Sequence, residues 1–306
     1  MNKKLAYLLL ILLPITVISF FLKETNFIMP ENKHAVDNTN NQEKIKTLTV
    51  SLSDKKETIS LEEYVIGVVA GEMPALFDLE ALKAQAIASR TYVINHLENH
   101  AQISSTISDQ VYLTKEEMQE KWKDKYDEYY SKINQAVQET KGQIMYYKNA
   151  PIKAYYYSMS NGYTESSLNV FNEQNDYLNV VISPYDADNS HTEILAKETF
   201  CEKLEITCEK ISIKNVQKDD SNRISSITIN EKQFTGIQIR KKLSLRSTDF
   251  EISENQENPN DLKIITKGYG HGVGMSQHGA NNMAKLGFTY EEILKYYYQN
   301  IEIDEL

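Results

Sequence analysis

Gly71-Glu72-Met73-Pro74, followed shortly by Asp78-Leu79-Glu80-Ala81-Leu82-Lys83-Ala84-Gln85-Ala86, predicts two helices joined by a tight turn. The first helix should begin at Ser60-Leu61-Glu62-Glu63, which has the spacing of a capping box, and should end near Gly71. Asp78 is the expected N-cap of the second helix, which should run to about Leu97. Its alanines are small enough for another element to pack closely against it.

A second informative stretch lies almost 200 residues further along the chain. It reads Gly268-Tyr269-Gly270-His271-Gly272-Val273-Gly274-Met275-Ser276-Gln277. Alternating glycines allow backbone conformations that other residues avoid, and they let a loop lie close to a ligand. Gln277 and His278 should begin the helix that follows, and a capping box at Thr289-Tyr290-Glu291-Glu292 should open a last helix through Tyr298.

The pattern of predicted helices and strands over the whole domain favours an α+β fold with two lobes around a central cleft. A hairpin is expected from residue 45 to about residue 60, a helix over 124–140 and a second hairpin over 144–160, turning at Lys148-Asn149-Ala150. We assign residues 45–172 to a catalytic lobe and the β-rich residues 173–262 to a smaller insertion lobe. Residues 263–306 should complete the catalytic lobe.

The N-terminus has the pattern of a membrane anchor. Lys3 and Lys4 precede an apolar run over 5–22 that is about long enough to cross a bilayer. We predict a single transmembrane helix over 1–23 with a cytoplasmic N-terminus, a flexible linker over 24–44, and an extracytoplasmic domain. A cleaved signal peptide is the alternative, although no obvious cleavage site follows the run. A buried core helix is a third reading.

Charge and cysteine content exclude some classes of function. The formal net charge of −10 argues against a nucleic-acid partner, because no basic stripe is available to replace phosphate counterions. Cys201 and Cys208 are the only cysteines and could form a disulfide, remain free or ligate a metal. Two cysteines do not make a zinc motif, so we predict no metal and no cofactor.

Glu72 is the strongest catalytic candidate. The C-terminal end of a helix dipole beside it should raise its pKa, and a carboxylic acid that stays protonated near neutral pH suits glycosidic bond cleavage. The competing reading is a solvated carboxylate at a helix end.

In Tyr155-Tyr156-Tyr157-Ser158-Met159-Ser160-Asn161, strand alternation places Tyr156, Ser158 and Ser160 on one face, where they could line a sugar groove. The alternative is a strand with a polar, solvent-facing side. His271 could orient a substrate or share a proton with Glu72.

Other catalytic templates fit less well. The chain has neither G-x-S-x-G nor HExxH. A zinc-dependent hydrolase using His191, His271 and the cysteines remains a rival reading.

Together the stretches at 71–90, 156–165 and 268–280, with Tyr296-Tyr297-Tyr298, resemble the stage II sporulation protein D family of peptidoglycan lytic transglycosylases. The resemblance implies that Glu72 protonates the bond between N-acetylmuramic acid and N-acetylglucosamine, after which the muramyl 6-hydroxyl forms a 1,6-anhydro end. It implies peptide-stripped glycan strands as substrate, stage II sporulation proteins P and M as partners, and action at the mother-cell septal or engulfing membrane. The candidate substrate-binding residues are Tyr156, Ser158, Ser160, Asn161, His271, Gln277, Gln110 and Tyr297.

Two positions depart from the family pattern. Some relatives carry a zinc site of cysteines and histidines shortly after the catalytic helix, but residues 104–112 contain neither cysteine, so we transfer no zinc. His278 stands where many relatives have tyrosine. A non-catalytic, glycan-binding scaffold of the engulfment complex remains the alternative function, and Glu72 separates the two readings.

Overall fold

Helix α3 (Leu79–Leu97) is the centre of the larger of two hydrophobic cores in the computed structural model, which describes residues 47–51, 56–106, 109–186 and 189–306. The helix before it, α2, spans Leu61–Glu72. Both predicted N-caps are confirmed: the Ser60 side chain accepts the Glu63 N–H, and the Asp78 side chain accepts the Glu80 N–H. The mixed α+β class predicted from the sequence is confirmed.

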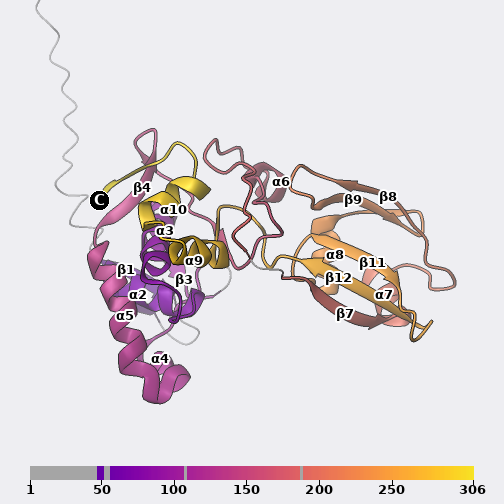
Figure 1. The fold of residues 1–306 in the computed structure, drawn as a ribbon, viewed down its shortest axis with the longest axis horizontal. Helices are drawn as coiled ribbons and strands as arrows, with labels where there is room; N and C mark the ends of the chain where they lie inside the picture. The colour runs from indigo at the N-terminus through magenta and orange to yellow at the C-terminus, as the bar shows by residue number, and fades with distance from the viewer. Residues whose placement is uncertain (1–46, 52–55, 107–108, 187–188) are drawn as a thin grey trace, which may run out of the picture. The chain divides into compact units, whose positions relative to one another are not determined.

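The alanines of α3 allow close packing on several sides. Ala81, Ala84 and Ala88 are completely buried. Around them pack α2, α5 (Tyr126–Glu139), α9 (Gln277–Lys285), α10 (Tyr290–Tyr297) and strand β4 (Gln143–Tyr147), so the two ends of the described chain share one core (Figure 1).

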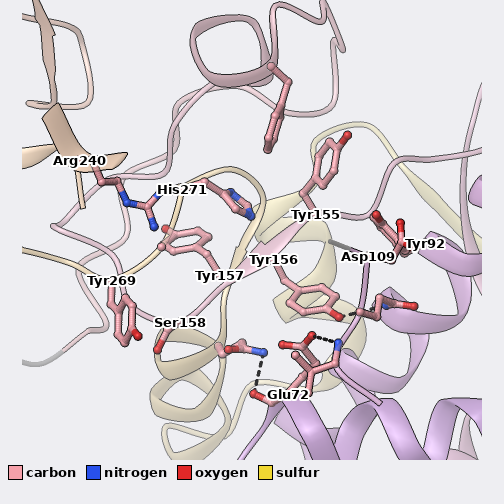
Figure 2. A pocket seen from close by; sticks show the side chains of 15 residues that line it. Glu72, Tyr92, Asp109, Tyr155, Tyr156, Tyr157, Ser158, Arg240, Tyr269 and His271 are labelled. Carbon is pink, nitrogen blue, oxygen red and sulfur yellow. Dashed lines mark hydrogen bonds between the residues drawn. The ribbon is translucent and has the colours of Figure 1, made fainter. Parts of the chain in front are cut away.

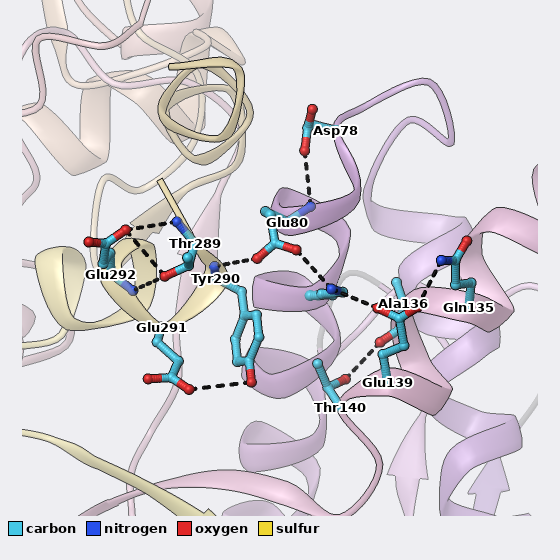
Figure 3. Close-up of polar contacts among 11 residues, drawn as sticks. Asp78, Glu80, Gln135, Ala136, Glu139, Thr140, Thr289, Tyr290, Glu291 and Glu292 are labelled. Carbon is cyan, nitrogen blue, oxygen red and sulfur yellow. Dashed lines mark hydrogen bonds and ion pairs between the residues drawn. The ribbon is translucent and has the colours of Figure 1, made fainter. Parts of the chain in front are cut away.

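A polar network fixes the first turn of α3 against helices from distant parts of the sequence (Figure 3). The Glu80 carboxylate accepts the backbone N–H of Tyr290 at 2.8 Å and the Lys83 ammonium at 2.8 Å. Lys83 also pairs with Glu139 of α5 at 2.7 Å. The Thr289–Glu292 capping box that begins α10 is present as predicted.

A buried ion pair joins α2 to α3. The Arg90 guanidinium is completely buried and contacts both carboxylate oxygens of Glu62, at 3.0 and 2.6 Å. Its Nη1 donates to the Gln143 carbonyl at 3.1 Å. A bidentate pair of this kind fixes orientation as well as distance, and it therefore sets where the far end of α2 lies.

Two three-stranded sheets of the described residues belong to this core. The predicted N-terminal hairpin is confirmed as β1 (Thr47–Ser51) and β2 (Lys56–Ser60), with β3 (Ile103–Ser104) alongside β1. Strand β4 pairs with β14 (Glu302–Glu305) and β5 (Ala150–Pro151).

The hairpin predicted over 144–160 is much shorter than expected. Its turn lies at the predicted place, where Lys148 and Asn149 have positive φ, but its return strand is only Ala150–Pro151. Beyond it, β6 (Tyr156–Tyr157) pairs instead with β13 (Met275–Ser276), a partner distant in sequence.

The second core is built from the region between the two key stretches. Its antiparallel sheets have the orders β10-β9-β8 and β11-β12-β7. Their strands and helices are β7 (His191–Ala196), α7 (Lys197–Leu204), β8 (Ile213–Lys218), β9 (Ile224–Ile229), β10 (Lys232–Thr235), α8 (Gly236–Leu243), β11 (Asp249–Glu254) and β12 (Asp261–Lys267). Tyr177 and Leu178, which the sequence assigned to the insertion lobe, pack in the first core.

Three short helices complete the described fold: α4 (Lys115–Trp122), η1 (Lys123–Lys125) and α6 (Ser167–Phe171). Helix α4 was not predicted from the sequence; it is strongly polar and has one buried side chain, Met118. Within the described residues, no helix combines the length and apolar character needed to cross a membrane. The predicted anchor over 1–23 and linker over 24–44 lie outside those residues.

Candidate functional site

A pocket of about 510 Å³ brings the two key stretches together (Figure 2). Six of the nine predicted site residues line it, namely Glu72, Gln110, Tyr156, Ser158, His271 and Gln277. Its remaining lining residues are Tyr92, Asp109, Val111, Tyr155, Tyr157, Phe171, Arg240, Tyr269 and Gly270. None of these nine residues was predicted from the sequence to have a role in the site.

Glu72 is the last residue of α2, and two glycines on that helix determine its surroundings. A Cβ on Gly71 would lie 2.4 Å from the Val111 carbonyl oxygen, and one on Gly67 would lie 2.2 Å from the Tyr112 ring. Only glycine therefore lets the segment after β3 lie directly on α2. That close approach allows the Val111 N–H to donate to Glu72 Oε1 at 2.7 Å.

The pKa of the Glu72 carboxyl is raised above its ordinary value. Burial is the largest cause, and it is opposed by hydrogen bonds from the Val111 N–H and the Tyr156 side chain. The direction agrees with the sequence prediction, but the leading cause is desolvation in the pocket, whereas the prediction relied on the helix end. The side chain is half-buried at the pocket wall, so it can meet a ligand.

A directional chain of hydrogen bonds ends at Glu72. The Tyr64 hydroxyl donates to Gln110 Oε1 at 3.0 Å, and Gln110 Nε2 donates to the Tyr156 hydroxyl oxygen at 3.0 Å. Because the Tyr156 oxygen already accepts from Gln110, its own proton is left for Glu72. Gln110 is completely buried, so here it orients Tyr156.

The glycine-rich loop lies against the residues that follow β5. Tyr269 and Met159 exchange two backbone hydrogen bonds, at 2.8 and 3.0 Å. Gly274 has φ +77°, and a Cβ there would lie 1.9 Å from the Tyr155 carbonyl oxygen. The loop can therefore adopt this path only with glycine at position 274.

His271 lines the pocket, where the sequence predicted it would orient a substrate or share a proton with Glu72. Its Nδ1 accepts the Val273 N–H at 3.0 Å, and its ring also bonds to the Tyr156 backbone. Burial, with the charges of Arg240 and Arg223, lowers its pKa to about 4, so the ring is neutral at physiological pH. Backbone groups of Val273 and Tyr156 hold the ring, and no hydrogen bond between His271 and Glu72 is present among the described residues.

Gln277 and Ser158 connect elements at the base of the pocket. Gln277 Nε2 donates to the Glu72 carbonyl at 3.1 Å and to Gln85 Oε1 at 3.3 Å, which joins the start of α9 to the end of α2. The Ser158 carbonyl accepts the His278 N–H at 3.0 Å. His278 itself packs edge-on against Phe77 and does not line the pocket.

Three predicted site residues lie outside this pocket. Ser160 is buried and donates to the Ser183 carbonyl at 3.1 Å, and Tyr297 is buried with its hydroxyl 3.1 Å from Ser183 Oγ. Asn161 Nδ2 donates to the Ser221 carbonyl and to Asp249, at 2.8 and 2.9 Å. In this structure these side chains hold neighbouring segments together and do not face the space beside Glu72.

The predicted alternation over residues 155–160 does not extend to Ser160, which lies outside the pocket, and it does not confine the pocket to one face of the strand. Tyr155 and Tyr157, expected on the face opposite Tyr156, also line the pocket, and both rings pack near His271. The reason is that β6 is only two residues long, so the two-residue period of a strand does not extend beyond it. The run of three tyrosines was the visible signal for this aromatic wall.

Asp109 is a second carboxylate at the pocket wall. Its Oδ2 accepts the Ser104 N–H at 2.8 Å, and its Oδ1 lies 3.6 Å from Nδ1 of His96. It was missed because nothing in its local sequence distinguishes it from a turn aspartate.

The cysteines provide no metal ligands, since Cys201 and Cys208 form a disulfide with a Cα–Cα distance of 5.6 Å. Among the described residues, no group of three or more histidine, cysteine, aspartate and glutamate side chains is arranged to hold a metal ion. The rival reading of a zinc hydrolase therefore loses two of its ligands.

Comparison with known proteins identifies the family. Residues 52–147 match the family described as Stage II sporulation protein (SpoIID). The chain is 41% identical over 262 residues to stage II sporulation protein D of Bacillus subtilis (strain 168), covering 81% of this chain and 76% of that protein. The chain belongs to the stage II sporulation protein D family. This membership supports a role in sporulation.

Two further relatives extend the comparison. The Bacillus amyloliquefaciens stage II sporulation protein D is 40% identical over 266 residues, covering 81% of this chain and 75% of that protein. The amidase enhancer of Bacillus subtilis (strain 168) is 29% identical over 288 residues, covering 76% of this chain and 39% of that protein. The stage II sporulation protein D family thus has a more distant relative that is named for its effect on an amidase.

Proposed function

We propose that this chain is a peptidoglycan lytic transglycosylase that acts on peptide-stripped glycan strands during sporulation. The observation that carries the proposal is one half-buried carboxyl, Glu72, with a raised pKa in a pocket walled by tyrosines. A protonated carboxyl can donate to a glycosidic oxygen, and aromatic rings pack well against sugar faces.

The reaction needs one group that gives and then takes a proton. Glu72 donates its proton to the oxygen between N-acetylmuramic acid and N-acetylglucosamine as the bond to the muramyl anomeric carbon breaks. The resulting carboxylate then accepts the proton of the muramyl 6-hydroxyl as that oxygen bonds to the anomeric carbon. The products are a 1,6-anhydro end and a free 4-hydroxyl, and water takes no part.

The hydrogen-bond chain from Tyr64 suits both halves of this cycle. The Tyr156 hydroxyl stabilises the carboxylate that forms when Glu72 gives up its proton, and Gln110 keeps that hydroxyl pointed the right way. Burial works in the opposite direction and favours the protonated acid. The two effects on the pKa of Glu72 oppose each other, which suits a group that first gives and then takes a proton.

A second hollow beside Glu72 suits a polymeric substrate. It measures about 370 Å³ and is lined by Glu72, Leu76, Lys121, Trp122 and Tyr129, among others. Because Glu72 lines both hollows, sugars on either side of the broken bond would each have a surface to bind. The Trp122 ring there packs edge-on against Tyr129.

A glycoside hydrolase is the second candidate function, and Asp109 is the observation that favours it. A hydrolase commonly uses two carboxylates, and Asp109 lines the same pocket as Glu72. The scaffold reading is the third, in which the pocket binds glycan without cleaving it.

The cellular setting is also part of the proposal. Anchoring through residues 1–23 would hold the enzyme in the mother-cell septal and engulfing membrane with its pocket outside. Stage II sporulation protein P would strip stem peptides from the strands, and protein M would be a further partner.

The test is product analysis by mass spectrometry after incubation of the full-length protein with peptide-free glycan strands. Anhydromuramyl ends from wild type, absent with Glu72→Gln, support the transglycosylase. Reducing ends that disappear with Asp109→Asn would establish a hydrolase instead. Binding without either product would favour the scaffold.

A further inference from the structure

The pocket has a positively charged end that the proposed proton transfers do not use. Arg240, on α8 of the second core, lines the pocket, and in Figure 2 its side chain extends toward His271 and Tyr157. Its Nε donates to the Leu245 carbonyl at 3.3 Å. Among the described residues its two terminal nitrogens make no hydrogen bond and no ion pair.

A second arginine strengthens this charge. Arg223 is only 2% exposed; its Nη1 donates to the Tyr163 carbonyl at 3.2 Å, and its Nε has no hydrogen-bond partner. Burial lowers the pKa of Arg240, and the nearby positive charge of Arg223 lowers it further. The two guanidinium groups therefore lie close enough for each charge to act on the other. No carboxylate of the described residues forms a salt bridge with either group.

Neither Arg240 nor Arg223 has a carboxylate partner among the described residues, although the chain has 43 aspartates and glutamates against 33 lysines and arginines. A partly buried, unpaired cation disfavours folding unless something else provides the anion. Since Arg240 lines the pocket, a ligand in that pocket can provide it. Guanidinium groups bind carboxylates especially well, through two parallel hydrogen bonds.

We propose that Arg240 binds the free lactyl carboxylate of an N-acetylmuramic acid residue and thereby selects glycan that carries no stem peptide. This inference rests on the proposed function for its substrate class. The lactyl carboxylate is the only anionic group of a strand built from N-acetylglucosamine and N-acetylmuramic acid. A stem peptide converts it to an amide, which removes the charge and adds bulk at the same point.

Arg240 is thus a specificity-determining residue, separate from the acid that breaks the bond. Losing a charge-assisted hydrogen bond typically weakens binding by about 10- to 100-fold. The same factor should separate the free acid from its amide in the wild-type pocket.

Calorimetric titration tests the proposal. Full-length Glu72→Gln protein, which should bind without cleaving, is titrated with the disaccharide N-acetylglucosaminyl-N-acetylmuramic acid and with its lactyl amide. The free acid should bind about 10- to 100-fold more tightly. Adding Arg240→Gln should bring the two affinities together, whereas Arg240→Lys, which keeps the charge, should retain part of the preference.

Lys241→Gln is the matched control. It removes the same charge from the next residue of α8, whose side chain is exposed, and it should leave the preference unchanged. Thermal unfolding of each variant shows whether the pocket is folded.

Equal affinity for acid and amide, no binding of either, or a preference that persists in folded Arg240→Gln protein, would overturn the inference. Cleavage by protein with Glu72 intact is measured in parallel. Selective binding without cleavage would refute the proposed reaction and leave the role of Arg240 standing. Cleavage without selective binding would support the reaction and refute the role of Arg240.

Discussion

Replacing Glu72 by glutamine should separate catalysis from stability in this protein. The amide has nearly the shape of the carboxyl group and can still accept the Val111 N–H, which lies 2.7 Å from Oε1. The fold should therefore be retained. What is lost is the transferable proton, and removing a general acid typically lowers the rate by about 10²–10⁴-fold. At 1.36 kcal/mol per tenfold, this adds about 2.7–5.4 kcal/mol to the barrier.

The same substitution should not lower stability at neutral pH. Because burial raises the pKa of Glu72 above its value of 4.5 in an unfolded chain, the folded state disfavours the charged form. At a pH below 4.5 the group is neutral in both states, and the variant and wild type should be equally stable. As the pH rises through the folded-state pKa, wild type must carry a buried charge, so the variant should become the more stable protein.

The assay pairs product analysis with thermal unfolding at about pH 4 and pH 8. Glu63→Gln is the control, because it removes an exposed carboxylate from the same helix and should leave turnover unchanged. The reasoning fails if Glu72→Gln cleaves glycan at a rate within tenfold of wild type. It also fails if the variant is less stable than wild type at pH 8.

Other substitutions test the surroundings of the acid. Tyr156→Phe removes a hydrogen bond that lowers the pKa of Glu72, so the alkaline limb of the kcat/KM profile should move to higher pH; a move to lower pH contradicts this. Gly71→Ala should slow turnover at least about tenfold and lower Tm, despite alanine's helix preference of about 1 kcal/mol, because the new Cβ displaces Val111. An active variant that unfolds at wild-type temperature would refute it. Trp122→Ala should raise KM for long strands by about 2- to 12-fold, from the 0.5–1.5 kcal/mol of a typical aromatic contact, with kcat nearly unchanged. An equal rise in KM for a disaccharide substrate would argue against a second sugar-binding surface.

Local sequence was enough to predict the elements that carry Glu72. The N-caps Ser60 and Asp78 and the capping box at Thr289 depend on residues a few positions apart, so they form wherever those residues occur. The position of Glu72 at the end of α2 follows from the same local information, whereas its pKa is raised chiefly by burial in the pocket. The loop glycines also mark an unusual backbone that the structure contains.

Long-range packing decided the rest of the site. Strand β6 pairs with β13 across more than 100 residues, and this pairing, which no local pattern specifies, turns Tyr155 and Tyr157 into the pocket. Arg240 reaches the same pocket from the second core.

By itself, therefore, the sequence determined which helix carries the acid and where the backbone must bend, because capping and glycine conformation are local. Only the tertiary structure decided what surrounds the acid. Ser160 and Tyr297 form hydrogen bonds with Ser183, and the buried Gln110 donates to the Tyr156 hydroxyl. A buried polar side chain must find a partner, and which partner it finds depends on segments that meet only when the whole domain packs.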